Sequence, residues 1–134
     1  MVVRSNVETL NSSLESMRDE VNNALEALIQ DEVDMGAGEV AVEAGRVLNA
    51  GGKRLRPILF LLAYRVAGGA NQEDVMPLAL AFELIHTATL VHDDINDEAQ
   101  QRRGIPTIHA NAGQAKAVIA GCLLYTSPSP RDDS

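Results

Sequence analysis

Residues 83–97 have the sequence ELIHTATLVHDDIND, in which an apolar helical repeat runs directly into a cluster of acidic residues. Apolar and small side chains recur along residues 78–89, which overlap this stretch, at spacings of three and four, as they do along one face of an α-helix. The repeat consists of Leu78, Phe82, Ile85 and Thr89. It predicts a long helix that begins at about Gln72 or Pro77 and ends at Glu98.

Helical spacing extends to both sides of this segment. Residues 7–33 form an acidic amphipathic pattern that ends at the glycines of residues 35–38, and a shorter helical stretch follows at 40–48. Residues 57–66 are almost wholly apolar, so we expect that helix to be buried, and residues 111–121 are small and apolar enough for a packed helix. No internal repeat and no convincing strand hairpin is visible. The pattern predicts an all-α fold.

Composition excludes several classes of protein. The 134 residues contain 11 Lys and Arg against 19 Asp and Glu, a net charge of −8, which argues against a general nucleic-acid binder. Apolar residues make up 46% and aromatic residues 3%, which favours helices over a β-sandwich. No apolar run is long enough to predict a membrane span, and no signal peptide is visible. The single cysteine, Cys122, cannot form an internal disulfide, and we expect a cytoplasmic protein.

The last thirteen residues, 122–134, depart from the helical pattern and contain two prolines. One interpretation is a disordered tail. The interpretation that we favour is that residues 122–132 resemble the translation of a transposon-end sequencing adaptor. On that hypothesis residues 1–121 are the N-terminal part of a larger domain, residues 122–134 are a non-native tail, and Cys122 says nothing about the redox compartment.

The acids at the end of the long helix are spaced for a shared task. Asp93 and Asp97 are four residues apart and lie on one helix face, with Asp94 about 100° round the axis. The helix dipole and the repulsion between the carboxylates disfavour negative charge at this C-terminal end, so a bound cation would stabilise it. Carboxylates and substrate phosphates together suit Mg²⁺. The alternative is a solvated acidic helix end, because such pairs are common on exposed helices.

Basic residues gather at two loops. Lys53, Arg54 and Arg56 lie in a glycine-rich loop beside a helix start, and Arg102 and Arg103 follow the acids. Glycine loops, helix N-termini and arginine forks all favour phosphate groups. The alternative is that each cluster is an ordinary surface patch that pairs with nearby acids.

His86 precedes Asp93 by seven residues, which places it on about the same helix face and about 10 Å away along the axis. A single histidine on an apolar helix is usually a core group, but this position also suits a contact with a diphosphate. His92 and His109 have no such geometric argument, and we expect them to be structural.

Three motifs resemble one enzyme family. GGKRLRP at residues 51–57, the stretch at 83–97 and RRG at 102–104 are similar, in order and spacing, to those of the trans-type isoprenyl diphosphate synthases, or polyprenyl synthases. The resemblance covers about Val7 to Gly121. It includes the first aspartate-rich motif of the family and lacks the second, which lies in the family's C-terminal half. The fold implied is the N-terminal part of the isoprenoid synthase helical bundle, truncated.

The resemblance also implies a division of roles. Magnesium and the diphosphate of an allylic substrate would be held by Asp93, Asp94 and Asp97, with Arg102 on the same diphosphate. Isopentenyl diphosphate would be bound by Lys53, Arg56, His86 and Arg103. Ionisation of the allylic substrate and attack by the isopentenyl double bond would then extend the chain by five carbons. No substrate contact is assigned to Arg54.

In this family the growing prenyl chain runs down a tunnel along the helix, from Asp93 toward earlier residues. The small side chains of Thr89 and Ala88 would leave that tunnel open, so we expect a product of geranylgeranyl length or longer. Phe82 is a candidate for the tunnel floor, although an ordinary core position explains it as well.

We therefore expect a Mg²⁺-dependent prenyltransferase that is a homodimer when complete. The main alternative is a non-catalytic subunit of a heteromeric prenyl diphosphate synthase. A terpene cyclase shares the aspartate motif but has no second diphosphate for the loop at residues 51–57 to bind. The chain as written lacks the second aspartate motif, so we expect it to be inactive by itself.

Overall fold

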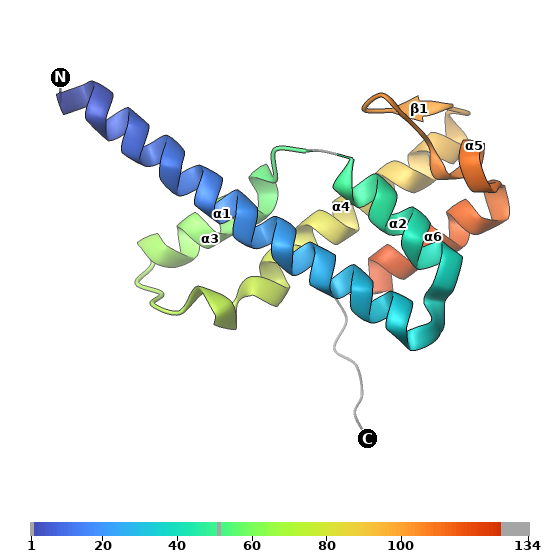
Figure 1. The fold of residues 1–134 in the computed structure, drawn as a ribbon, viewed down its shortest axis with the longest axis horizontal. Helices are drawn as coiled ribbons and strands as arrows, with labels where there is room; N and C mark the ends of the chain where they lie inside the picture. Colours follow the sequence, from blue (N-terminus) through green and yellow to red (C-terminus); the bar gives the residue numbers. More distant parts are fainter. Residues whose placement is uncertain (1, 51, 127–134) are drawn as a thin grey trace.

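The computed structural model describes residues 2–50 and 52–126, and it confirms the all-α prediction (Figure 1). The elements are α1 (Val2–Glu32), the π-type turn η1 (Val33–Ala37), α2 (Gly38–Asn49), α3 (Leu55–Val66), the 3-10 turn η2 (Gln72–Asp74), α4 (Met76–Asn96), β1 (Gln101–Arg102), β2 (Ile105–Pro106), α5 (Ile108–Ala112) and α6 (Gln114–Thr126). The helix predicted from the apolar repeat is α4.

Helix α1 is the longest element, and its N-terminal part projects beyond the other helices (Figure 1). Met17, Val21 and Leu25, spaced four residues apart, are buried and fix its second half against the rest of the molecule. Gly36 and Gly38 have φ angles of 98° and 57°, which residues with a Cβ rarely adopt. These glycines turn the chain back so that α2 packs along α1.

Helix α4 lies at the centre of the core. It packs between α3 and α6, and its buried side includes Leu84, Ala88 and Val91. The crossing with α6 is close, because a Cβ on Gly121 would overlap the ring of His92. The same ring faces the carbonyl of Val118 on α6, with Nε2 at 3.2 Å. The predicted structural role of His92 agrees with this position.

One side of α4 is open to solvent. Leu78, Phe82 and Ile85 are 59%, 49% and 40% exposed, and the same helix face continues to the exposed residues Thr89, Asp93 and Asp97. We call these six residues the open stripe. An apolar band thus leads along the helix surface directly to Asp93, Asp94 and Asp97. We call these three residues the acidic end.

The expectation that the apolar helix at residues 57–66 is buried was wrong in part. Pro57, Ile58 and Leu61 of α3 are buried, but Leu59 and Val66 are 62% and 88% exposed. The reason is that α1 and α4 cover only one side of α3. The composition of a helix shows how much surface it needs to bury, and the neighbouring elements decide how much is covered.

The absence of a hairpin was also a wrong expectation. Residues Gln101–Arg102 pair antiparallel with Ile105–Pro106, joined by Arg103 and Gly104 with φ angles of 53° and 79°. Positive φ at both turn residues is the geometry of a two-residue hairpin turn whose twist matches the strands. Strands of two residues are too short to show any alternation in the sequence.

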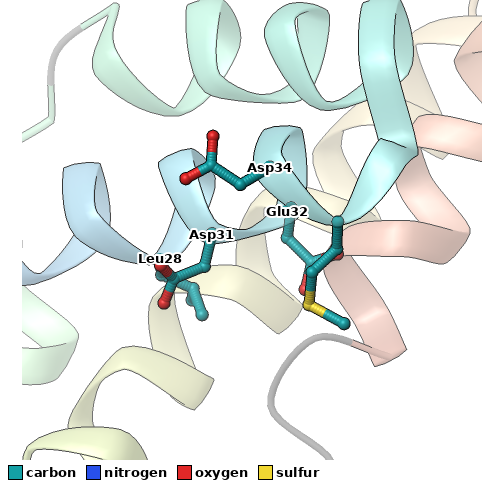
Figure 2. Close-up of a pocket in the computed structure, with 5 residues that line it drawn as sticks. Leu28, Asp31, Glu32 and Asp34 are labelled. Carbon is teal, nitrogen blue, oxygen red and sulfur yellow. The ribbon is translucent and has the colours of Figure 1, made fainter.

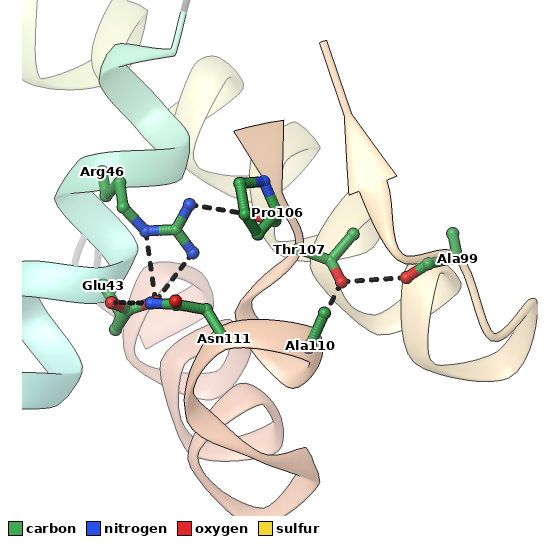
Figure 3. Close-up of polar contacts among 7 residues, drawn as sticks. All are labelled: Glu43, Arg46, Ala99, Pro106, Thr107, Ala110 and Asn111. Atoms are coloured by element: carbon green, nitrogen blue, oxygen red, sulfur yellow. Dashed lines mark hydrogen bonds and ion pairs between the residues drawn. The ribbon is translucent and has the colours of Figure 1, made fainter. Parts of the chain in front are cut away.

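Polar contacts fasten the hairpin and α5 to α2 (Figure 3). Arg46 donates to the carboxylate of Glu43 at 2.8 Å and to the carbonyl of Pro106 at 2.8 Å, and Asn111 donates to Glu43 at 2.9 Å. The hydroxyl of Thr107 donates to a backbone carbonyl in the turn after α4 at 2.8 Å. The hairpin is therefore held at the C-terminal end of α4.

The predicted tail begins inside a helix. α6 runs from Gln114 to Thr126, and Leu124 is buried in the core, whereas residues 127–134 lie outside the described part of the chain. The origin of residues 122–134 stays a prediction, since a helix can continue across a sequence junction. Among the helices of the described residues, none combines the length and the apolar character needed to cross a membrane.

Candidate functional site

Four side chains that the sequence analysis assigned to one substrate lie around one cavity. Lys53, Arg56, His86 and Arg103 line a depression of about 190 Å³, together with Gly52, Arg54, Leu55 and Glu83. We call it the basic pocket. Its cations come from three places in the chain: the loop before α3, the first turn of α3 and the hairpin turn. A diphosphate entering it would meet several positive charges at once.

The glycine loop takes its shape from two unusual backbone angles. Gly52 has a φ angle of 135°, and a Cβ there would come within 3.2 Å of Nη1 of Arg103. Arg54 has a φ angle of 56°, in the left-handed region that non-glycine residues seldom occupy. The loop therefore needs a glycine where the guanidinium of Arg103 approaches it. It also needs contacts that hold Arg54 in its left-handed conformation.

Arg54 supplies that hold by pointing inward. Its side chain is buried, and it forms an ion pair with Glu83 on α4 at 2.9 Å. It also donates to Asn22 on α1 at 2.8 Å and to the carbonyl of Leu48 on α2 at 2.6 Å. The sequence assigns no substrate contact to Arg54, and it does not reveal these partners, because they lie 6 to 32 residues away in the chain.

His86 lies in a positive environment. Burial lowers its pKa, and Arg56 lowers it further, with smaller contributions from Arg103 and Arg102 in the same direction. Glu83, on the same helix, opposes them. The pKa is thus below its ordinary value of 6.5, so the imidazole is mostly neutral at pH 7. A bound anion would favour the protonated form.

The three aspartates of the acidic end have different surroundings. Asp93 and Asp97 are exposed, and in residues 2–50 and 52–126 no hydrogen bond or ion pair engages their carboxylates. Asp94 is buried and accepts two hydrogen bonds from Arg102, from Nη2 at 2.7 Å and from Nε at 2.9 Å. This bonding raises the pKa of Arg102 above its ordinary value. In this structure, the carboxylate of Asp94 therefore pairs with Arg102, whereas those of Asp93 and Asp97 face solvent.

The exposed carboxylates of Asp93 and Asp97 suit a hard cation that keeps part of its hydration shell. Within the described residues, no group of three or more His, Cys, Asp or Glu side chains converges as a metal site. Two carboxylates on one helix face nevertheless suit Mg²⁺, which typically takes one or two protein carboxylates and completes its shell with water and substrate phosphates. The donor set of Asp93 and Asp97 is thus compatible with a metal that arrives with its substrate.

The two residues proposed to set product length lie on different sides of α4. Thr89 belongs to the open stripe, and its hydroxyl donates to the carbonyl of His86 at 2.6 Å. Ala88 is 2% exposed and packs in the core. Of the two, only Thr89 borders the open surface that leads to the acidic end.

Another cavity, of about 310 Å³, lies where α1 runs into η1 (Figure 2). Its lining consists of Leu28, Asp31, Glu32, Asp34 and Met35. Acidic side chains there would repel a diphosphate, and none of these residues lines the basic pocket.

His109, expected to be structural, bonds through Nε2 to the carbonyl of Ala99.

Fold and site together define a class of protein: an all-α chain in which a basic pocket and an acidic helix end both border α4. Comparison with known families agrees with this class. Residues 40–129 match the model of the Polyprenyl synthetase family, and the chain belongs to that family.

Relatives of known sequence are similar over most of this chain. It is 42% identical to the geranylgeranyl diphosphate synthase of Methanosarcina mazei over 117 residues, which are 84% of this chain and 36% of that protein. It is 43% identical to heptaprenyl diphosphate synthase component 2 of Geobacillus stearothermophilus, over 78% of this chain and 31% of that protein. The chain thus spans about a third of the length of these relatives.

Solved structures have the same fold. The geranylgeranyl pyrophosphate synthetase from Geoglobus acetivorans superposes with a TM-score of 0.78 at 36% identity, covering 86% of this chain and 36% of that one. A geranyltransferase from Legionella pneumophila superposes with a TM-score of 0.82 at 27% identity, covering 92% and 43%.

Proposed function

We propose that this chain is part of a prenyltransferase that joins isopentenyl diphosphate to an allylic diphosphate. The observation that carries the proposal is the basic pocket, in which Lys53, Arg56, His86 and Arg103 meet although they are spread over 51 residues of sequence. The exposed carboxylates of Asp93 and Asp97, at the end of the helix α4 that carries His86, supply the second half of the site. Two diphosphates would then lie side by side along α4.

The basic pocket would bind isopentenyl diphosphate. Lys53, Arg56 and Arg103 would neutralise its charge, and the two arginines would fork onto phosphate oxygens. His86 would take up a proton as the diphosphate arrives and donate a hydrogen bond to it. Held by its diphosphate, the substrate would present its double bond in one orientation, which lowers the entropic part of the barrier.

The acidic end would bind the allylic diphosphate. Asp93 and Asp97 would hold Mg²⁺, whose charge would stabilise the departing diphosphate. Arg102, fixed by Asp94, would place a second positive charge at that diphosphate. The allylic C–O bond would break with its electron pair on the diphosphate, and the double bond of isopentenyl diphosphate would form the new C–C bond to the allylic carbon. Loss of a proton to the departed diphosphate would then restore a double bond.

We further propose a product of geranylgeranyl length or longer, because the small side chain of Thr89 leaves room on the open stripe that leads to the acidic end. The same proposal includes a homodimer and a cytoplasmic location for the complete protein. Resemblance to the family supports both the dimer and the location.

The test uses the protein encoded by the longest reading frame that contains residues 1–121. With isopentenyl diphosphate, farnesyl diphosphate and Mg²⁺ it should form a longer prenyl diphosphate, detected by chromatography. The variants Asp93→Asn and Asp97→Asn should each lower kcat by about a hundredfold or more. The matched variant Asp19→Asn, at another exposed aspartate, should leave the rate unchanged.

A second candidate function is a non-catalytic subunit of a heteromeric synthase. The similarity to a protein named heptaprenyl diphosphate synthase component 2 favours the heteromeric assembly that this candidate requires. In that case the protein alone would bind isopentenyl diphosphate but form no product in the assay above. Product formed by the single purified chain would exclude this alternative.

A further inference from the structure

Arg54 is enclosed by three helices although both Lys53 and Arg56, on either side of it, are exposed. All three guanidinium nitrogens have partners: Nε donates to Asn22, Nη1 to Glu83 and Nη2 to the carbonyl of Leu48. The partners lie on α1, α4 and α2, so one side chain connects the loop to every helix that surrounds it.

These contacts stabilise an otherwise disfavoured backbone. Arg54 immediately precedes α3 with a φ angle of 56° and a ψ angle of 34°, in the left-handed region where a Cβ is crowded. Because the guanidinium is anchored inside, the backbone must reverse at this residue. The reversal leaves Lys53 and Arg56 on the outer side, where both line the basic pocket.

Stability alone does not account for the pair of Arg54 and Glu83. The two side chains are only 3% and 5% exposed, and burial removes both charges from water. An apolar pair of similar size is often as stable as a buried ion pair, because the desolvation penalty offsets the Coulombic attraction. What an apolar pair lacks is direction, whereas a planar fork with three partners fixes the loop in one place.

Glu83 makes the pairing important for the pocket as well. It lines the basic pocket and stands one helical turn before His86. Released from Arg54, its carboxylate would be an internal anion close to Lys53 and Arg56. It would then compete with a diphosphate for the same cations.

We propose that Arg54 is a positioning residue for isopentenyl diphosphate: through Glu83, Asn22 and the carbonyl of Leu48 it fixes the loop of residues 52–56 so that Lys53 and Arg56 face His86 across the pocket. The inference rests on the proposed function, and it adds a residue that touches no substrate itself. Its signature is a selective effect on one substrate.

The experiment again uses the protein from the longest reading frame. The double variant Arg54→Met/Glu83→Leu removes both buried charges together and should keep the fold. We expect its KM for isopentenyl diphosphate to rise about tenfold or more, with little change in the KM for the allylic substrate. Arg54→Lys, which keeps the charge but not the three-way fork, should shift the same KM in the same direction. The control Lys116→Met/Glu39→Leu removes an exposed ion pair and should leave both KM values unchanged.

The inference is overturned if the folded double variant keeps its KM for isopentenyl diphosphate within about twofold, or if both KM values rise equally. If the double variant does not fold, Arg54→Lys decides by the same criteria. Failure of the proposed function looks different, because the wild-type protein would then form no prenyl product. In that event the affinity for inorganic pyrophosphate decides: weaker binding by Arg54→Lys than by wild type supports the positioning role, and equal binding or none overturns it.

Discussion

Single side chains at the acidic end differ in what their carboxylates contact. Asp93 and Asp97 face solvent, while Asp94, beside Asp93 in the chain, is buried and paired with Arg102. A helix places consecutive residues about 100° apart, so three acids within five residues cannot all face one way. We therefore infer a supporting role for Asp94, in which it orients Arg102.

Replacing Asp94 separates this supporting role from metal binding. Asp94→Asn should lower the free energy of unfolding by about 1–3 kcal/mol, because it leaves the guanidinium of Arg102 beside a neutral amide. Arg102 is 32% exposed, so water limits the loss. Chemical denaturation measures the change, and Glu39→Gln at an exposed ion pair is the control, with an expected loss of about 0–1 kcal/mol. An equal loss in both variants would contradict the structural role of Asp94.

His86 should take up a proton when a diphosphate binds. Its pKa in the free protein is lowered by burial and by Arg56, Arg103 and Arg102, against the opposing effect of Glu83. Binding of an anion raises that pKa again, so affinity should increase as pH falls toward the pKa of the free state. Calorimetry of pyrophosphate binding in buffers of different ionisation enthalpy measures the uptake at pH 7. His86→Gln should lack this component, and equal uptake in both proteins would refute it.

The same pKa shift has a consequence for folding. The folded-state pKa of His86 is below its unfolded value, so the unfolded chain binds the proton more readily. The contribution of this group to stability is therefore complete above pH 6.5 and is lost as pH falls through the folded-state pKa. The partial exposure of the ring keeps the contribution small.

Much of the basic pocket could be predicted from single residues. Lys53, Arg56, His86 and Arg103 belong to motifs whose residue types favour phosphate, and the structure brings them together. The inward turn of Arg54 could not be predicted, because nothing in its immediate neighbours distinguishes it from two exposed cations. Its direction depends on partners that are 6 to 32 residues away in the chain.

Helices were easier to predict than the surfaces they cover. The bounds of α4 follow from its apolar repeat and from Pro77, which suits a first helical turn. Whether Leu59 on α3 or Phe82 on α4 is covered depends on elements packed from outside, which periodicity does not describe. The ring of Phe82 contacts Phe60 with centroids 5.4 Å apart and still remains half exposed.

The two faces of α4 predict different effects of added bulk. Thr89→Phe places a ring on the open stripe and should shorten the prenyl product of the complete protein, as measured by chromatography. Ala88→Phe places the same ring in the packed core and should lower the free energy of unfolding by about 1–3 kcal/mol. If Ala88→Phe shortens the product without loss of stability, then Ala88 borders the product channel and its burial here does not describe the complete enzyme.

The molecule as a whole leaves large apolar side chains of α3 and α4 exposed to solvent. Leu78, Phe82 and Ile85 form a continuous band on α4, and exposed residues of α3 add to the apolar surface. In the relatives, two thirds of the protein lies beyond the part that this chain matches. We therefore expect the 134-residue chain to bind apolar dyes, to self-associate and to show no transferase activity.

The double variant Leu78→Gln/Phe82→Gln tests this expectation in the 134-residue chain. Dye fluorescence and the associated fraction in sedimentation should both fall, with little change in the thermal midpoint, because Leu78 and Phe82 are already 59% and 49% exposed. Leu10→Gln, at an exposed position on the projecting part of α1, is the matched control. An equal fall in the control would show that association does not depend on the open stripe.

The hairpin of residues 101–106 joins two neighbouring arginines that serve different halves of the site. Arg102 reaches Asp94 at the acidic end, and Arg103 lies over Gly52 in the basic pocket. Since one peptide bond connects them, any movement of the hairpin that follows binding at one arginine displaces the other. On the proposed function, this movement would link the affinities of the two halves, and such coupling is reciprocal: each diphosphate would change the dissociation constant of the other by the same factor.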